Sequence, residues 1–284
     1  MDQLLKHPYL LQRCLLAVCP ISDVIRDEPH LIRDGWDYFK TFWNKDYECM
    51  FMKQVGRRGL LDLAVWYHEC FKVIRSDLLV EAARNNKLNI LIWAKKIYPD
   101  VFEPNVFSQA ALHGSLNVLN YFRDEVSVYD NPYIVDYAAK GNQLEVLEWM
   151  YEHFPGNQGT YYLLSWICRP ECTFEVFQWV CDFMHPFNQR AQEWYHHLLL
   201  EHQEEKLKYL YQRRQIGEIP FNRAVKLLGV RPTPNIPFLE WFFRCVIDVK
   251  QVFQQYPSLV WKELEELIKK RHAPLVKVIS LYLI

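Results

Sequence analysis

The hexamer Leu61-Asp-Leu-Ala-Val-Trp66 recurs along the chain and decides the fold. The copies follow one form: apolar, polar, apolar, apolar, polar, aromatic. Positions one, three, four and six of this form cover one broad face of a helix that begins near its first residue. The clear copies are Leu88–Trp93, Leu116–Tyr121, Leu144–Trp149, Phe174–Trp179 and Ile236–Trp241, and weaker ones are Glu204–Tyr209 and Ala273–Val278. Successive copies start 27 to 37 residues apart, which indicates an internal repeat.

A shorter helix is predicted before each hexamer. Nine residues before the first four hexamers stands a large apolar residue, and six and five residues before them stands a pair of mostly small residues. Small side chains allow a neighbouring helix to approach closely, as stacked helical pairs require. These pairs are Val55-Gly56, Ala82-Ala83, Ala110-Ala111 and Ala138-Ala139.

The same four units share a helix-ending residue two positions before the hexamer: Gly59, Asn86, Gly114 and Asn142. Gly and Asn tolerate the left-handed backbone conformation that ends many helices. Sustained alternation of apolar and polar residues, the pattern of strands, is missing. The sequence therefore predicts an all-α fold in which helix–turn–helix repeats stack into a solenoid, because each pair buries its apolar face only against its neighbours.

Two stretches resemble the centre of an ankyrin repeat. They read Ala110-Ala-Leu-His-Gly-Ser-Leu-Asn-Val-Leu119 and Ala138-Ala-Lys-Gly-Asn-Gln-Leu-Glu-Val-Leu147. The period of 27–28 residues and the Trp that ends most hexamers are similar to the divergent ankyrin repeats of some protists and of large DNA viruses, including the multigene families of African swine fever virus. The resemblance covers about residues 47–150 and continues more loosely to 180.

The chain departs from the usual ankyrin pattern in two ways. The Thr-Pro-Leu-His opening is absent, and only Asp77 and Asn105 stand where its Thr would cap the first helix. A standard repeat of about 33 residues has room for a β-hairpin, whereas these units are about five or six residues shorter. The resemblance therefore implies an ankyrin-like solenoid whose β-hairpins are reduced or absent.

One continuous domain with three parts is predicted. Residues 1–46 contain an aromatic cluster and are interpreted either as an N-terminal helical cap on the first repeat or as an F-box-like segment. Residues 47–212 carry the ankyrin-like repeats. Residues 213–284 carry divergent repeats, interrupted by the Pro-rich stretch 231–237, and a C-terminal cap. The aromatic cluster consists of Trp36, Tyr38, Phe39, Phe42 and Trp43.

Composition and charge exclude several classes of partner. The 33 Lys and Arg nearly cancel the 34 Asp and Glu, giving a net charge of −1 and a pI near 6.8. This balance does not favour nucleic acid or an anionic membrane as the main partner. The start Met-Asp-Gln lacks the basic region of a signal peptide, and no stretch approaches the about 20 apolar residues of a membrane span. We expect a cytoplasmic, intracellular monomer.

No pattern in the sequence indicates catalysis. Phosphate-binding loops, dinucleotide fingerprints and the common hydrolase motifs are missing, and only 9 Gly are present. Cys168 and Cys172 lack the regular second ligand pair of structural zinc, although His185, His196, His197 and His202 follow them. The expectation is a protein that is not an enzyme and holds no metal or cofactor. A Cys–His pair assembled in space is the alternative.

The aromatic residues that end the hexamers allow two interpretations. Exposed rings could stack on nucleic-acid bases, whereas buried rings would be major stabilisers of the core. Their repeat position is that of the core-facing Leu on the second ankyrin helix, so we predict core packing. The residues are Trp66, Trp93, Tyr121, Trp149, Trp179 and Trp241.

Basic and polar residues gather four and three residues before the first four hexamers. In an ankyrin-like stack these positions end the first helix, near the concave groove where partners usually bind. They form either an ordinary solvated face or a basic strip that binds an acidic segment of a partner. The candidate partner-binding residues are Arg57, Arg58, Arg84, Asn85, His113 and Lys140.

The predicted function is a protein–protein interaction scaffold without enzymatic activity, which binds an unknown partner protein through the concave face of the solenoid. The resemblance implies a viral or parasite factor that acts on host proteins inside the host cell. The alternative is a substrate adaptor of a ubiquitin ligase, in which residues 1–46 dock on the ligase and the repeats select the target.

Overall fold

The computed structural model describes residues 21–128, 132–156, 159–184, 197–199, 203–213, 219–229, 236–270 and 272–283. Residue contacts divide the chain into two compact units, Met1–Asn157 (unit 1) and Gln158–Ile284 (unit 2), which are considered separately below. The described residues form helices and no strands, which confirms the all-α prediction. The proposed boundaries at residues 46/47 and 212/213 stay predictions.

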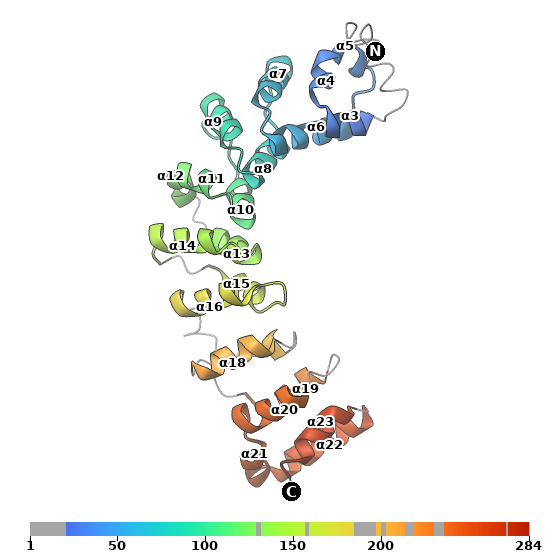
Figure 1. Ribbon diagram of the computed structural model, residues 1–284, viewed down its shortest axis with the longest axis vertical. Helices are drawn as coiled ribbons and strands as arrows, with labels where there is room; N and C mark the ends of the chain where they lie inside the picture. The colour runs from blue at the N-terminus through green and yellow to red at the C-terminus, as the bar shows by residue number, and fades with distance from the viewer. Residues whose placement is uncertain are drawn as a thin grey trace. The chain divides into compact units, whose positions relative to one another are not determined.

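The described part of unit 1 starts with three short helices, followed by helices that lie on two sides of the unit (Figure 1). In chain order they are α3 Ile21–Asp27, α4 His30–Asp34, α5 Trp36–Phe39, α6 Lys45–Arg58, α7 Leu61–Phe71, α8 Ser76–Arg84, α9 Leu88–Ile97, α10 Pro104–Leu112, α11 Leu116–Tyr121, α12 Arg123–Val128, α13 Pro132–Lys140 and α14 Leu144–His153. We call α6, α8, α10 and α13 the first helices of unit 1, and α7, α9, α11 and α14 its second helices.

Unit 2 is also helical where it is described. Its elements are α15 Tyr161–Ile167, α16 Phe174–Phe183, α18 Glu204–Gln212, α19 Phe221–Leu228, α20 Ile236–Trp241, the π-helix η2 Phe242–Val246, α21 Val249–Gln255, α22 Pro257–Lys269 and α23 Ala273–Ser280.

Every copy of the hexamer starts a helix, as predicted. The six clear copies begin α7, α9, α11, α14, α16 and α20 at their first residue, and the two weaker copies begin α18 and α23 in the same way. In the six clear copies the third and fourth hexamer positions point into the core. In α7 and α9, for example, Leu63, Ala64, Ile90 and Leu91 are almost completely buried.

The first helices of unit 1 pack against one another in sequence: α6 against α8, α8 against α10, and α10 against α13 (Figure 1). The small pairs predicted for close approach are buried. At Gly56 a β-carbon would lie 2.5 Å from the carbonyl oxygen of Leu78 in the next first helix. A larger residue at this position would therefore push α6 and α8 apart.

The first helices of unit 1 all end in the same way. Gly59, Asn86, Gly114 and Asn142 have φ values between 56° and 74°, which confirms the predicted left-handed conformation. In each case the next residue donates its backbone N–H to a carbonyl five residues back, as in a Schellman motif. These bonds are Leu60→Val55, Lys87→Ala82, Ser115→Ala110 and Gln143→Ala138, at 2.8 to 3.0 Å.

The same bond precedes α18 and α23 in unit 2, where no Gly or Asn revealed it. Gln203 donates to Leu198 at 2.9 Å before α18, and His272 donates to Leu267 at 3.0 Å before α23. These are the two places where the sequence carries only weak hexamers. Asp77 and Asn105, expected as caps, are instead the second residues of α8 and α10.

The predicted core packing of the hexamer-ending rings holds for one of six. Trp149 is 7% exposed, whereas Tyr121 is 57% exposed and the other four rings are half-buried. The helical period accounts for this correction. At 3.6 residues per turn, the sixth position lies about 110° away from the midpoint of the buried third and fourth positions. The sixth residue therefore flanks the core and is covered only where neighbouring residues reach it.

Residues 21–43 pack against the first helical pair of unit 1. Helix α3 contacts α6, and α4 contacts α7. The ring centroid of Trp36 lies 5.6 Å from those of Trp66 and Phe71 in α7, and Trp43 lies 5.7 Å from Phe51 in α6. The aromatic cluster predicted from the sequence therefore contributes to the hydrophobic contact between this segment and the first pair.

Candidate partner-binding site on the first helices of unit 1

The C-terminal ends of the first helices bring four of the six candidate residues into one linked cluster. Arg57 lies in the last turn of α6, Arg84 is the last residue of α8 and is followed by Asn85, and His113 directly follows α10. We call these residues, together with Glu81 and Lys140, the first-helix face.

Glu81 lies at the centre of this face, and the sequence analysis missed it. Its carboxylate is almost buried, at 6% side-chain exposure, and accepts from Nη1 of Arg84 at 2.9 Å. Nε of Arg57 and Nδ2 of Asn85 each lie 3.5 Å from the other carboxylate oxygen, Oε2. Asn85 also donates a shorter hydrogen bond of 2.8 Å to the backbone carbonyl of Glu81. A carboxylate out of water needs such partners. Glu81 therefore fixes side chains from two successive first helices, α6 and α8.

A sequence signal for Glu81 existed. Among the first four repeats it is the only acidic residue at its position, where the others carry Gln54, Gln109 and Tyr137. It also stands three residues before Arg84, the spacing at which side chains meet on a helix.

His113 extends the cluster to the end of the next first helix, α10. Nε of Arg84 donates to Nε2 of His113 at 3.1 Å. Partial burial, and secondly the positive charge of Arg84, lower the pKa of His113 below its ordinary value. The imidazole is therefore neutral at pH 7, and its other nitrogen, Nδ1, carries the proton.

Lys140 is the last residue of α13 and stands four residues before the fourth hexamer, as Arg84 does before the second. It is exposed, and its ammonium lies 5.6 Å from the centroid of the Tyr137 ring in the same helix. This distance is within the range of a cation–π contact.

Arg58 has a different role from the one its repeat position suggests. Its Nη1 and Nη2 donate to the carbonyl oxygens of Asp27 and Arg26, at 3.0 and 2.5 Å. These carbonyls end α3, where basic side chains satisfy unpaired acceptors. The contact ties the N-terminal segment to α6 and points the Arg58 guanidinium away from the cluster around Glu81.

The first-helix face keeps a positive charge despite Glu81. Arg57 and Arg84 carry two positive charges against one negative charge, and their side chains remain 53% and 37% exposed. Lys140 adds another positive charge. Guanidinium groups held in place bind carboxylates through paired hydrogen bonds. The arrangement suits binding of an anionic group.

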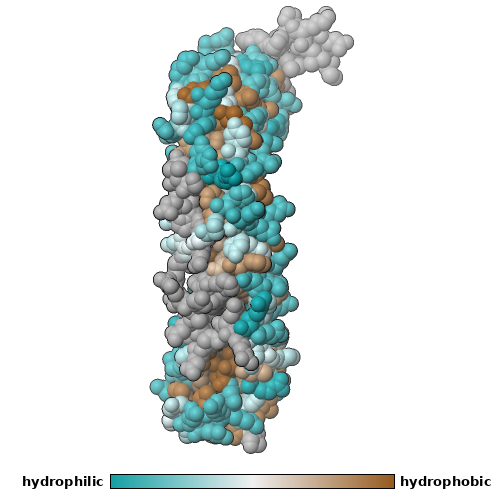
Figure 2. All heavy atoms as spheres, turned by 90° about the vertical axis from the view of Figure 1, so that its left-hand side faces the viewer, coloured by the Kyte–Doolittle hydropathy of each residue, from teal (hydrophilic) through white to brown (hydrophobic). Residues whose placement is uncertain are grey.

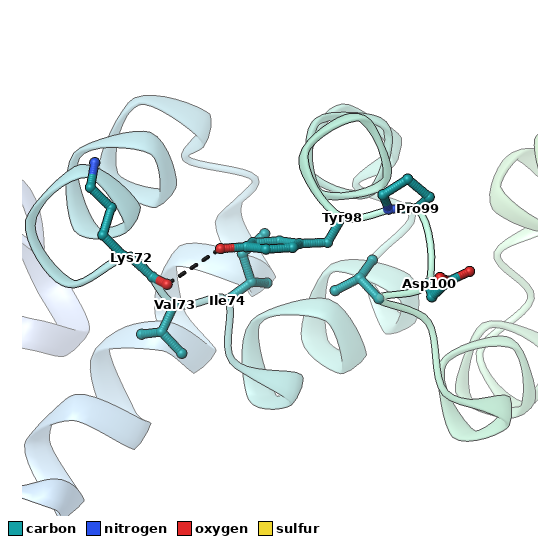
Figure 3. Close-up of a pocket in the computed structure, with 7 residues that line it drawn as sticks. Lys72, Val73, Ile74, Tyr98, Pro99 and Asp100 are labelled. Carbon is teal, nitrogen blue, oxygen red and sulfur yellow. Dashed lines mark hydrogen bonds between the residues drawn. The ribbon is translucent and has the colours of Figure 1, made fainter.

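A separate surface pocket of about 430 Å³ lies between the loops that follow α7 and α9. Figure 3 shows the ring of Tyr98 lying across it, with its hydroxyl directed at the carbonyl oxygen of Lys72, 3.3 Å away. Its other lining residues are Val73, Ile74, Pro99, Asp100 and Val101. Its lining is mostly apolar.

Exposed rings are also found on the second helices of unit 1, at Phe71, Tyr121 and Tyr151. On this side Figure 2 shows hydrophobic surface in separate patches among hydrophilic surface. Scattered apolar side chains of this kind are ordinary on a folded protein.

In unit 2 the two cysteines considered for zinc are buried thiols. Burial raises the pKa of Cys172 to about 11 and that of Cys168 further, so neither is a thiolate at pH 7. No group of three or more metal-ligating side chains occurs among the described residues. His185, His196 and His202 lie outside them.

None of the described helices has the length and apolar character needed to cross a bilayer. Comparisons of the chain with protein-family models, with curated proteins and with solved structures found no match.

Proposed function

We propose that the chain is an ankyrin-like repeat solenoid that acts as a non-enzymatic interaction protein and binds an acidic segment of a partner protein through the first-helix face. The observation that carries this proposal is the continuous link Arg57–Glu81–Arg84–His113. It joins the ends of three successive first helices, α6, α8 and α10, and holds two partly exposed guanidinium groups in fixed positions.

Two observations support the solenoid. The first helices of unit 1 pack one against the next, and all four end with a left-handed Gly or Asn and the same backbone hydrogen bond. A repeat that buries its apolar face only against its neighbours is expected to reproduce its packing in each unit. The resemblance to divergent ankyrin repeats of viruses and protists favours an intracellular factor that acts on host proteins.

The alternative, a ubiquitin-ligase adaptor, requires residues 1–46 to present a docking surface. The contacts of Trp36 and Trp43 with the first helical pair support a cap instead. Deletion of residues 1–46 separates the two roles. Loss of co-purifying ligase subunits from a folded protein would favour the adaptor, whereas loss of helical structure would favour the cap.

Charge reversal tests the proposed function. The Arg57→Glu/Lys140→Glu variant changes two exposed cations of the first-helix face, and Lys96→Glu/Lys269→Glu changes two exposed cations elsewhere by the same net charge. Binding of a fluorescent library of acidic peptides is measured by anisotropy for both variants, after circular dichroism has established that each is folded. We expect binding to be lost only in the first variant and to weaken with salt. Equal binding by both variants contradicts the proposal.

A further inference from the structure

We propose that the first-helix face recognises one phosphorylated side chain in the acidic segment, a phosphomonoester that contacts Arg57 and Arg84 at the same time. This inference rests on the proposed function and adds the chemical class of the recognised group.

The two guanidinium groups form one compact site, because both converge on the carboxylate of Glu81. Nη1 of Arg84 lies 2.9 Å from one of its oxygens, and Nε of Arg57 lies 3.5 Å from the other. A single carboxylate therefore spans the space between the two cations. A second anionic group of similar size, approaching from the solvent, is able to reach both cations as well.

The charges of this site are arranged in depth. The side chain of Glu81 is only 6% exposed, whereas those of Arg57 and Arg84 are 53% and 37% exposed. An anion that arrives from water therefore meets the two guanidinium groups before the carboxylate, and electrostatic interaction weakens with distance. The surface that it meets is positive, although Glu81 cancels one of the two positive charges.

Hydrogen-bond donors remain open at this surface. Arg84 donates to Glu81 through Nη1 and to His113 through Nε, which leaves its Nη2. No hydrogen bond among the described residues uses Nη1 or Nη2 of Arg57. His113 is exposed, and its lowered pKa leaves it neutral with the proton on Nδ1. The site thus offers donors from three side chains at the ends of α6, α8 and α10.

A phosphomonoester fits these donors better than a carboxylate does. A carboxylate has two oxygens and one negative charge, whereas a phosphorylated side chain has three terminal oxygens and a charge of about −1.5 to −2 at pH 7. One oxygen is available for each of Arg57, Arg84 and His113. Clusters of arginine are a recurring means of binding phosphorylated peptides. A phosphodiester of a nucleic acid has one charge and two free oxygens, so it matches less well.

Three fluorescent pools of twelve-residue peptides test the recognised group. Each pool has phosphoserine, Glu or Ser at one central position and a random mixture of uncharged residues elsewhere. Binding is measured by anisotropy at low and physiological salt. We expect the phosphoserine pool to bind about tenfold more tightly than the Glu pool, and the Ser pool not to bind. Inorganic phosphate should compete only at higher concentration, since a peptide also contacts the surrounding surface.

Single substitutions test whether one phosphate contacts both cations. Arg57→Gln and Arg84→Gln should each weaken binding of the phosphoserine pool about tenfold, because each removes donors to the same group. Arg58→Gln is the matched control and should leave binding unchanged, because the Arg58 guanidinium bonds the carbonyls at the end of α3. Circular dichroism establishes that each variant is folded. If Arg84→Gln does not fold, His113→Ala takes its place.

The outcomes separate this inference from the proposed function. Equal binding by the phosphoserine and Glu pools, lost on charge reversal of the first-helix face, would overturn the phosphate and leave the proposed function standing. Weakening by only one of the two arginine variants would overturn the shared site. Inorganic phosphate or a single-stranded oligonucleotide that binds as tightly as the phosphoserine pool would overturn recognition of a side chain. Binding by no pool and by no member of the acidic library would overturn both proposals.

Discussion

The first helices of unit 1 and helix α15 of unit 2 meet the same requirement, the pairing of carbonyl groups at helix ends, by different means. In unit 1 the backbone does this through a left-handed Gly or Asn and a Schellman bond. The segment after α15 in unit 2 has no left-handed residue among Cys168–Thr173. There Nζ of Lys206 in α18 donates to the carbonyls of Ile167 and Arg169, at 2.9 and 2.6 Å.

Lys206 occupies the third hexamer position, which is apolar in every clear copy, and it is 3% exposed. Its ammonium lies 5.5 Å from the centroid of the Phe177 ring. Burial lowers the pKa of Lys206, but the two carbonyls and the ring favour the charged form. The comparison shows that different groups can meet the same physical requirement of a helix end.

The largest effect is expected from Trp149→Ala. Because Trp149 is buried, its truncation leaves a cavity and should lower the free energy of unfolding by about 3–5 kcal/mol. Tyr121→Ala, at the same hexamer position but 57% exposed, is the matched control and should change it by less than about 0.5 kcal/mol. Urea denaturation measures both. Similar losses would mean that burial does not distinguish these positions.

Lys206→Met tests the helix end of unit 2. Methionine preserves the length and the packing but leaves two carbonyls without a donor, at a cost of about 2–4 kcal/mol. Lys208→Met, two residues along the same helix and half-buried, should cost far less. A Lys206→Met protein as stable as the wild type would show that these carbonyls find other partners.

Gly114→Ala tests the corresponding end in unit 1. An alanine in the left-handed conformation costs about 1–2 kcal/mol. Its β-carbon would also lie too close to the side chain of Gln143, which directly precedes α14. Asn142→Ala changes the same repeat position and should cost less, because the starting residue already has a side chain. If Gly114→Ala melts at the wild-type temperature, the left-handed ending is not a stabilising element.

The smallest effect is expected from His113. Because its pKa is lowered in the folded state, the unfolded chain binds the proton more readily below about pH 6.5. The free energy of unfolding should therefore fall as the pH decreases from 7.5 through that range. His113→Gln should have a flatter pH profile, measured by thermal melting at several pH values. Identical slopes for the two proteins would mean that His113 does not contribute to the pH dependence of stability.

Much of unit 1 was predictable because its signals are local. The start of a helix at Leu88, the left-handed turn at Asn86 and the small pair Ala82-Ala83 depend on residues a few positions apart. In unit 2 the same bond before α18 escaped detection, because neither Gly nor Asn precedes Gln203 at the expected position. The candidate cations were also predicted from their offsets, but the separate role of Arg58 at the end of α3 was not.

By itself, the sequence determined where the hexamer helices begin and where the first helices of unit 1 end, since periodicity and turn residues act within one or two turns of the chain. Only the tertiary structure decided which polar groups are paired. Glu81 and Lys206 are ordinary surface residue types, and their burial depends on groups brought from other helices: Arg57 for Glu81, and the carbonyls of Ile167 and Arg169 for Lys206. A charge is stable out of water only with such partners, and no local pattern specifies them.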